Sequence, residues 1–259
     1  MKLIDIGANL ANQQFNNDLS NIIKESFQNN IQSIYSTTTN AETFFKNINI
    51  VEKYENIFTT WGLHPHNASQ LEQFILETKS YINNPKIKAI GEFGLDFFRM
   101  FSSEKEQEKT MDYFLEASKN LNLPLFMHER QAHERFLSIF KNHSSKNNGV
   151  IHCFTGNNKE LLNYLDLDLY IGITGWICDD RRNKDLIDCF SFLPLDKILI
   201  ETDSPYLKPR NLKKRSVRNE PKNLIYILEK IAFLKKISIE ELSLILYNNT
   251  MRFFNNEKN

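Results

Sequence analysis

Five apolar segments of this chain lead into histidine, glutamate or aspartate, the residue types that bind divalent metal ions in hydrolases. The segments IFTTWGLHPH, IKAIGEFGLD, PLFMHER, GVIHCFTG and KILIETDSPYL contain His64, His66, Glu92, His128, His152 and Asp203. A strand buried on both faces reads as a continuous apolar run, and parallel α/β folds place their chemistry at the carboxyl ends of such strands. Together, the five segments predict a metal-dependent hydrolase.

Each of these residues also has an ordinary structural explanation. A single glutamate after a strand is usually solvated, and a single histidine at the edge of an apolar run is usually a core residue or a helix cap. An aspartate before Ser-Pro, as at Asp203, is common in turns. His64 and His66 flank Pro65, and a buried structural role for one of them is as plausible as metal or phosphate binding. The number of such residues in one chain favours the metal site.

The composition favours one cytoplasmic globular domain over residues 1–259, a size common for α/β barrels. The formal net charge is +0, so any contact with a polyanion must be local. The three cysteines have no CxxC spacing, which indicates a reduced setting rather than a disulfide framework. The N-terminal sequence does not resemble a signal peptide, and no apolar run is long enough to predict a membrane span.

Strand-like and helix-like segments alternate along the chain. The predicted strands are Leu3–Gly7, Ile31–Thr37, Ile57–Gly62, Lys88–Glu92, Leu125–His128, Val150–Phe154, Leu169–Ile173 and Ile198–Thr202. The predicted helices include Asn17–Gln28, Glu42–Lys53, Ser69–Ile82, Ser103–Asn120, Ala132–His143, Arg182–Phe192, Lys222–Lys235 and Ile239–Phe254. About eight β/α units predict a TIM-type (β/α)8 barrel. A doubly wound sheet is the alternative, although neither GxGxxG nor GxxxxGK[ST] occurs.

Basic residues follow several of the same predicted strands. They are Arg99, Arg130, Arg181, Arg182, Lys208, Arg210, Lys213, Lys214, Arg215 and Arg218. A charge run is usually a solvated face, but in a barrel these loops share the face of the candidate metal ligands. Because arginine binds phosphate in a bidentate manner, we expect a substrate that carries phosphates. Phe97, Trp176 and Tyr206 lie in the same loops and either stack on bases or pack in the core.

The motifs, taken in order, resemble the TatD family of metal-dependent deoxyribonucleases. They are DIGANL, WGLHPH, AIGEFGLDF, PLFMHERQAHERF, VIHCFTG, YIGITGWICDDRR, ILIETDSPYLKPR and VRNEP, and they span nearly the whole chain. The resemblance implies a TIM barrel of the metallo-dependent hydrolase type, one or two divalent metals, and 3′-to-5′ exonuclease action on DNA, in some members on RNA. It also implies a metal site formed by Glu92, His128, His152 and Asp203, with His64 and His66 nearby.

The first strand departs from the D-x-H-x-H pattern of many family members. Gly7 and Asn9 occupy the two histidine positions. Glycine has no side chain to bind a metal, and the neutral oxygen of asparagine suits Mg²⁺ better than Zn²⁺. We therefore expect Mg²⁺ as the cofactor, with Mn²⁺ or Zn²⁺ as alternatives.

The predicted reaction is hydrolysis of phosphodiester bonds with a metal-activated water. Asp203 would orient or deprotonate the water, His64 would steady the phosphate, and His66 would protonate the leaving oxygen. The predicted substrate contacts are Asn9, Arg99, Arg181 and Arg218. We expect a monomer that acts on single-stranded ends of DNA or RNA, because a deep barrel mouth does not admit a duplex. DNA repair and fragment degradation are the expected roles.

Two other functions are compatible with the sequence. An amidohydrolase or esterase, such as a D-aminoacyl-tRNA deacylase, would use the same metal ligands, and the fold alone does not exclude it. A degenerate barrel that only binds nucleic acid or a protein partner is favoured by Gly7 and Asn9. The intact set of Glu92, His128, His152 and Asp203 argues against that second alternative.

Overall fold

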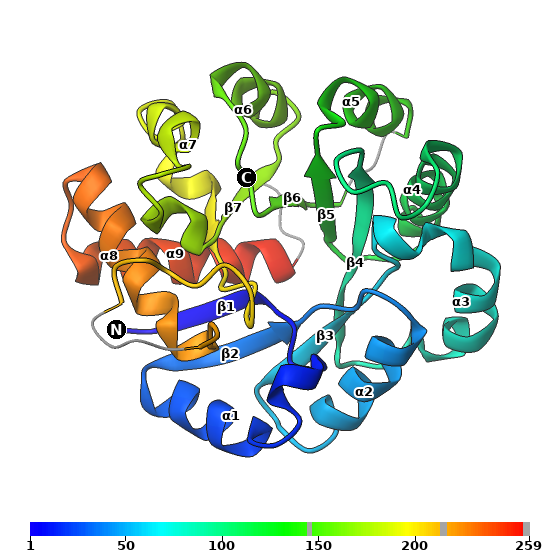
Figure 1. Cartoon of the computed structure of the whole chain (residues 1–259), viewed down its shortest axis with the longest axis horizontal. Helices are drawn as coiled ribbons and strands as arrows, with labels where there is room; N and C mark the ends of the chain where they lie inside the picture. The colour runs from blue at the N-terminus through cyan, green and yellow to red at the C-terminus, as the bar shows by residue number, and fades with distance from the viewer. Residues whose placement is uncertain (144–146, 213–216, 256–259) are drawn as a thin grey trace. The chain divides into compact units, whose positions relative to one another are not determined.

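The computed structural model describes residues 1–143, 147–212 and 217–255, in which strands and helices alternate (Figure 1). The strands are β1 (Leu3–Ala8), β2 (Ile31–Ser36), β3 (Ile57–Trp61), β4 (Ile87–Asp96), β5 (Leu125–Arg130), β6 (Gly149–His152), β7 (Tyr170–Ile173) and β8 (Ile198–Ile200). Each corresponds to a predicted strand. The largest difference is in β4, which continues past Glu92 to Asp96.

The helices follow the strands, as the sequence predicts. They are α1 (Leu19–Gln28), α2 (Ala41–Val51), α3 (Leu71–Thr78), α4 (Glu104–Ser118), α5 (His133–Asn142), α6 (Asn158–Leu165), α7 (Lys184–Cys189), α8 (Leu224–Lys235) and α9 (Ile239–Phe254). The predicted helix Ser69–Ile82 is shorter than expected, because 3-10 turns replace its two ends. None of the helices in the described part of the chain is long and apolar enough to cross a membrane.

The chain forms two compact units. The first unit comprises residues 1–36 and 153–252. In it β1 pairs with β2 and β7 with β8, all parallel, and the amide of Asp203 donates to the carbonyl of Gly7 at 2.8 Å, joining β8 to β1. The second unit holds residues 37–152 and the described residues 253–255, and in it β3, β4, β5 and β6 are parallel neighbours. The single domain over residues 1–259 stays a prediction.

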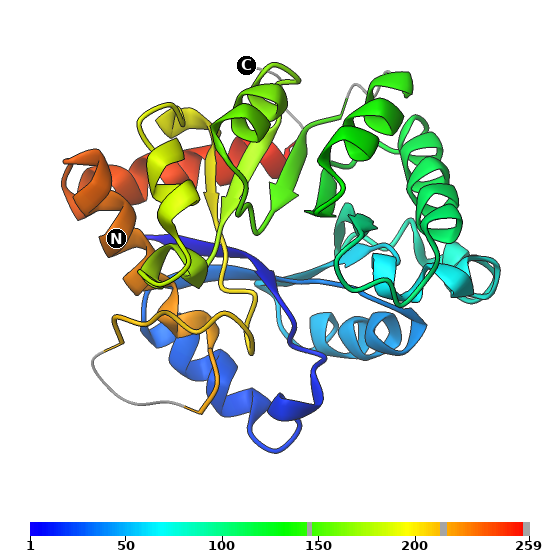
Figure 2. The same cartoon turned by 45° about the horizontal axis from the view of Figure 1, so that its top comes forward.

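Helix α4 begins where its sequence predicts. Ser103 accepts a hydrogen bond from the amide of Glu106, and the Glu106 carboxylate accepts one from the amide of Ser103 at 2.8 Å. This reciprocal capping satisfies two backbone donors that the first turn leaves unpaired. Met111, Phe114 and Leu115 then form one buried face of the helix. Figure 2 shows α4 and α5 alongside β4 and β5, the strands that carry Glu92 and His128.

Two glycines bring β4 and β5 unusually close together around Glu92. Gly91 and Gly94 have φ values of 152° and 146°, which favour glycine. A Cβ atom on Gly94 would lie 1.9 Å from the carbonyl oxygen of His128, and one on Gly91 would lie 2.2 Å from that of Phe126. The GEFG sequence therefore fixes how Glu92 and His128 face each other.

Two residues of predicted elements have surroundings that the sequence does not give. The predicted strand Val150–Phe154 includes Cys153, but β6 ends at His152 and Cys153 is half-buried with φ 49°. His133, in the predicted helix Ala132–His143, is buried because it shares the inner face of α5 with Phe136 and Leu137.

Candidate metal centre

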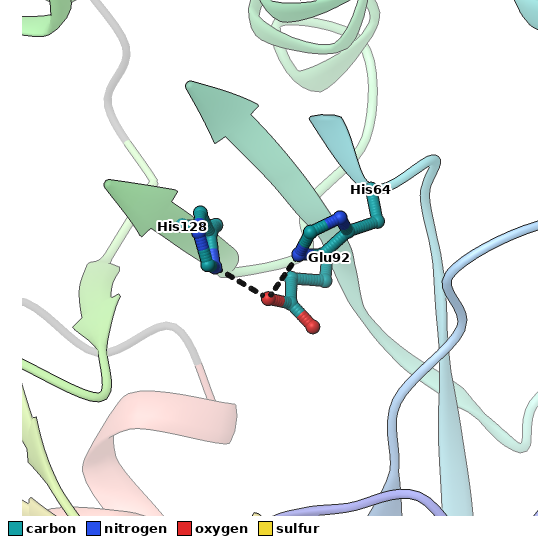
Figure 3. Close-up of side chains that lie close together, drawn as sticks. All are labelled: His64, Glu92 and His128. Atoms are coloured by element: carbon teal, nitrogen blue, oxygen red, sulfur yellow. Dashed lines mark hydrogen bonds and ion pairs between the residues drawn. The ribbon is translucent and has the colours of Figure 1, made fainter. Parts of the chain in front are cut away.

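Three segments of the second unit bring metal-binding side chains to one point. Glu92 of β4 places its Oε1 3.4 Å from Nε2 of His64, which follows β3, and 2.9 Å from Nδ1 of His128 in β5 (Figure 3). The ligand atoms of these three residues all lie within 4.8 Å of one another. One cation could contact all three side chains.

His152 joins the same cluster from the neighbouring strand. It pairs in register with His128, since β5 and β6 are parallel neighbours. Its Nε2 lies 3.6 Å from Oε1 of Glu92, and its side chain is buried. Three imidazoles therefore surround one carboxylate oxygen.

A second carboxylate, Asp96, extends the cluster toward His66. Asp96 Oδ2 lies 2.8 Å from Nε2 of His66 and 3.5 Å from Nε2 of His128. The predicted strand Lys88–Glu92 ends before Asp96, and the sequence therefore assigns Asp96 no role. The apolar spacing of Phe93 and Leu95, which continues the strand to Asp96, is the signal that would have found it.

The close packing of these groups shifts their protonation. Burial opposes the charge of Glu92, but His152, His64 and His128 outweigh it and hold the pKa of this carboxyl well below its usual range. Burial lowers the pKa of His64 to about 4. Burial also opposes protonation of His128, yet the nearby carboxylates of Asp96 and Glu92 raise its pKa to about 9. The pKa of Asp96 is lowered, because His128 and His66 outweigh its desolvation.

The donor set fits a divalent metal. Imidazole nitrogens and carboxylate oxygens together suit Zn, Mn and related ions, and metal ligands must be deprotonated. The ionised Glu92 and the neutral His64 meet that condition, whereas His128 would release a proton on metal binding. The buried Nε2 of His128 lies 3.5 Å from Asp96 Oδ2 and has no hydrogen-bond partner among the described residues. Two carboxylates and four imidazoles thus form a site that can hold a cation.

Asp203 lies in the first unit, in the segment that follows β8. Its Oδ1 accepts a hydrogen bond from Nδ2 of Asn9 at 2.8 Å, and its backbone has φ 50°. The preceding residue, Thr202, donates its amide and its hydroxyl to the carboxylate of Asp5, at 2.9 and 2.5 Å. Asn219 also donates to the Thr202 carbonyl at 2.8 Å. Hydrogen bonds from β1 and from the segment after β8 therefore hold this part of the chain.

Asp5 is a buried carboxylate to which the sequence assigned no role. It is fully buried, and desolvation raises its pKa to about 8 in spite of the hydrogen bonds from Thr202 and Gly7. At neutral pH it therefore favours the uncharged acid. No local sequence signal distinguishes Asp5 from a metal ligand, since it too lies in an apolar strand.

The predicted phosphate-binding arginines lie in different surroundings. The amide of Arg99 donates to Asp96 Oδ1 at 2.9 Å, and its exposed side chain lies beside Phe98. Arg181 makes two hydrogen bonds, of 2.8 and 2.7 Å, with Asp179. Arg218 is paired with Asp18 at 2.5 Å. The predicted basic residues Lys213, Lys214 and Arg215 lie outside the described residues.

A cavity of about 270 Å³ lies after β7 and β8 in the first unit. It is lined by Gly175, Trp176, Asp179, Arg182, Leu207, Lys208 and Arg210. The Arg182 guanidinium lies 4.1 Å from the centre of the Trp176 ring. Of the other two aromatic residues expected to meet bases, Tyr206 is half exposed and Phe97 is half-buried.

Comparison with known proteins places these features in context. Residues 4–255 match the family model described as TatD related DNase. A 3′-5′ ssDNA/RNA exonuclease TatD from Salmonella typhimurium is 41% identical over 237 residues, covering 89% of this chain and 90% of that protein. The corresponding enzyme of Escherichia coli K12 is 40% identical over the same coverage.

Solved structures support the same relationship. A TatD family hydrolase from Entamoeba histolytica has a TM-score of 0.88 at 28% identity, with 98% of both chains covered. A TatD homologue from Escherichia coli K12 has a TM-score of 0.85 at 27% identity, again with 98% of both chains covered. The expected fold class, a TIM (β/α)8 barrel of the metallo-dependent hydrolase type, is confirmed.

Proposed function

Because the chain belongs to the TatD family of DNases, we propose that it is a 3′-to-5′ exonuclease that hydrolyses phosphodiester bonds of single-stranded DNA or RNA. The observation that carries this proposal is the convergence of His64, His128 and His152 on the carboxylate of Glu92. A buried group of this kind is suited to a divalent metal, and metal-assisted hydrolysis is its natural chemistry.

We assign Glu92, His128 and His152, together with Asp203, to metal binding. The proposed metal is Mg²⁺, since Gly7 and Asn9 leave the first strand without imidazole ligands. When bound, the metal would neutralise charge on the scissile phosphate and lower the pKa of a water molecule.

Asp203, beside its part in metal binding, and His66 are assigned to proton transfer. Asp203 would accept the proton of the attacking water, and the amide of Asn9 orients the carboxylate by holding its Oδ1 at 2.8 Å. His66 would give a proton to the leaving 3′-oxygen. The Asp96 carboxylate lies 2.8 Å from Nε2 of His66 and would hold the imidazole in place.

Substrate binding is assigned to neutral and basic groups around these residues. His64 would steady the scissile phosphate as a neutral imidazole, since burial lowers its pKa to about 4. Arg99 and Arg181 keep exposed side chains that would contact phosphates along the strand, and Arg218 is a third proposed contact. The ion pair between Arg218 and Asp18 would have to open for that contact.

The expected setting of the enzyme is part of the proposal. All three cysteines are free, and two of them, Cys178 and Cys189, are buried, which is consistent with the reducing cytoplasm. We propose that the chain acts as a monomer there, in DNA repair or in the degradation of nucleic-acid fragments.

A single assay tests this function. The purified protein is incubated with a 5′-labelled single-stranded oligonucleotide in Mg²⁺, in Mn²⁺ and in EDTA, beside an Asp203→Asn variant. We expect a ladder that shortens from the 3′ end, requires metal and is lost in the variant. Asp188→Asn, on the exposed surface of α7, serves as the matched control that keeps activity.

Three outcomes would contradict the proposal in different ways. Equal degradation of blunt duplex and single strand would remove the preference for unpaired ends. Cleavage that persists in Asp203→Asn would remove Asp203 from the mechanism. Release of amino acid from charged tRNA, without release of nucleotides by a folded protein, would favour the esterase instead.

A further inference from the structure

The loop between β4 and α4 presents large apolar side chains to solvent. Phe98 is 50% exposed, Met100 is 42% exposed and Phe101 is 67% exposed. Exposed apolar side chains that gather beside a polar cluster are typical of binding surfaces, since water solvates them poorly. This loop follows directly from Asp96, the carboxylate that contacts His66 and His128.

The loop is held rigidly against the candidate metal centre. Asp96 Oδ1 accepts hydrogen bonds from the amides of Phe98 and Arg99, at 3.0 and 2.9 Å, while its Oδ2 faces His66. The buried Gln107 accepts from the amide of Asp96 at 2.7 Å and donates to the carbonyl of Ser102 at 2.9 Å. Both ends of the loop are therefore fixed before any substrate arrives.

Phe101 touches one of the residues proposed for catalysis. Its ring lies edge-on to the His66 imidazole, with a distance of 4.9 Å between the ring centres. Ser102 also donates its hydroxyl to the carbonyl of His66 at 3.2 Å. A group stacked on this loop would therefore lie beside the proposed proton donor.

Two arginines add positive charge to the same surface. The guanidinium of Arg130 lies 3.9 Å from the centre of the Phe98 ring, and that of Arg99 lies at 5.8 Å. Exposed aromatic rings accompanied by cations match an unpaired nucleotide, which offers a flat base and a phosphate. A small apolar ligand would not use the charges, and a duplex end keeps its bases stacked on one another.

We propose that Phe98 and Phe101 form a stacking platform for the bases at the 3′ end of a single strand, with Arg99 and Arg130 contacting their phosphates. This inference rests on the proposed nuclease function and names the groups that recognise its substrate. Because a stacking surface accepts any base, the platform selects for unpaired ends and not for sequence.

The test compares two short oligothymidines, one intact and one with abasic sites at its 3′-terminal nucleotides. The variants are Phe98→Ala, Phe101→Ala and the double substitution. Phe233→Ala, on α8 and 77% exposed, is the matched control. We expect the wild-type protein to prefer the intact strand by about 5- to 100-fold in kcat/KM, mostly through KM, and the double variant to lose this preference. The control should keep it.

A purely structural role for the two rings predicts something different. It would lower kcat/KM on both oligonucleotides by the same factor and leave the preference intact, which would overturn the proposal. A wild-type protein without any preference for the intact strand would overturn it as well.

A binding measurement separates this proposal from the nuclease function. Fluorescence anisotropy with the intact, 5′-fluorescein-labelled oligothymidine in EDTA requires no hydrolysis. Weaker binding by the double variant than by Phe233→Ala supports the platform even if the protein cleaves nothing. Binding that is equal in the two variants, or absent in the wild type, contradicts the platform even if the protein is a nuclease.

Discussion

Two buried carboxylates, Glu92 in β4 and Asp5 in β1, have opposite charge preferences. Both side chains lie in strands and are almost inaccessible to water. The pKa of Glu92 is held well below its usual range, whereas burial raises that of Asp5 to about 8. Glu92 lies among imidazoles that can carry positive charge, and Asp5 lies among the hydroxyl and amide groups of Thr202 and the amide of Gly7.

The difference shows what makes a buried carboxylate suitable for catalysis. Desolvation disfavours the ionised form of both carboxyl groups, and the neighbouring groups decide which of them stays ionised. Cationic or metal-binding neighbours preserve the charge of Glu92 for a cation. Neutral donors leave Asp5 as an acid that ties the ends of β1 and β8 together. Burial of a carboxylate therefore does not by itself identify a metal ligand.

Substitution of Glu92 by glutamine should have the largest effect. The amide keeps the size of the side chain but removes the charge that the three histidines surround. We expect kcat/KM on single-stranded DNA to fall by about 1000-fold, in keeping with the loss of one catalytic electrostatic contact. Initial rates and the metal content of the purified protein measure the effect. A variant within about tenfold of wild type that also keeps its metal would show that Glu92 is not a ligand.

Substitution of Asp5 by asparagine should alter the pH dependence of stability. The pKa of Asp5 is raised from 3.8 to about 8 on folding. The contribution of Asp5 to the free energy of unfolding is therefore fully present below pH 3.8 and is lost as the pH rises through about 8. Wild-type unfolding free energy should therefore fall by roughly 1 kcal/mol per pH unit across this window, relative to the variant.

Urea unfolding at several pH values between the two pKa values measures this difference. Asparagine resembles the protonated acid. The free energy of unfolding of Asp5→Asn should therefore match that of wild type near the lower pKa and exceed it near the upper one. Asp188→Asn, on exposed α7, controls for the loss of one charge. If the free energy of unfolding changed with pH in the same way for wild type and Asp5→Asn, Asp5 would be ionised in the folded protein.

Substitution of Asp96 by asparagine should have an intermediate effect on activity. The amide oxygen can still accept from the amides of Phe98 and Arg99, so the loop should hold its place. The charge facing His66 and His128 disappears, and loss of such a supporting carboxylate costs about 10- to 100-fold in activity or metal affinity. Rates at saturating metal separate a loss of activity from a loss of metal affinity. A variant whose only defect is weaker metal binding regains its activity when metal is saturating. Full activity at low metal would exclude a role for Asp96.

The sequence predicts the strands well because parallel strands buried on both faces are continuous apolar runs. It also predicts that Glu92, His128 and His152 lie close together, since each lies in such a run. The predicted strand stops at Glu92 although β4 continues to Asp96, because Gly91 and Gly94 resemble a turn and mask the alternation of Phe93 and Leu95. Only the structure shows that these glycines allow β4 to approach β5, where a Cβ atom would meet a carbonyl oxygen.

The pairing of His66 with Asp96 is also beyond sequence-based prediction. The two residues are thirty positions apart, and each has several local explanations. Their contact depends on the register of β4 and on the turn after β3. The same limit applies to Asp5 and Glu92, because Thr202, His64, His128 and His152, which face them, lie far away in the sequence.

Substitution of Thr202 by valine should have the smallest effect and tests the structural half of the comparison. Valine keeps the shape of threonine and the backbone hydrogen bond but removes the hydroxyl that lies 2.5 Å from Asp5 Oδ2. We expect the unfolding free energy to fall by about 1–2 kcal/mol, because a buried polar group loses a partner. Thr250→Val removes a buried hydroxyl that bonds only within α9, and it is the matched control for urea unfolding. If Asp5 only ties β1 to β8, kcat/KM should change far less than in Glu92→Gln. A loss of activity as large as that of Glu92→Gln, with unchanged stability, would instead place the Asp5 and Thr202 pair in the reaction itself.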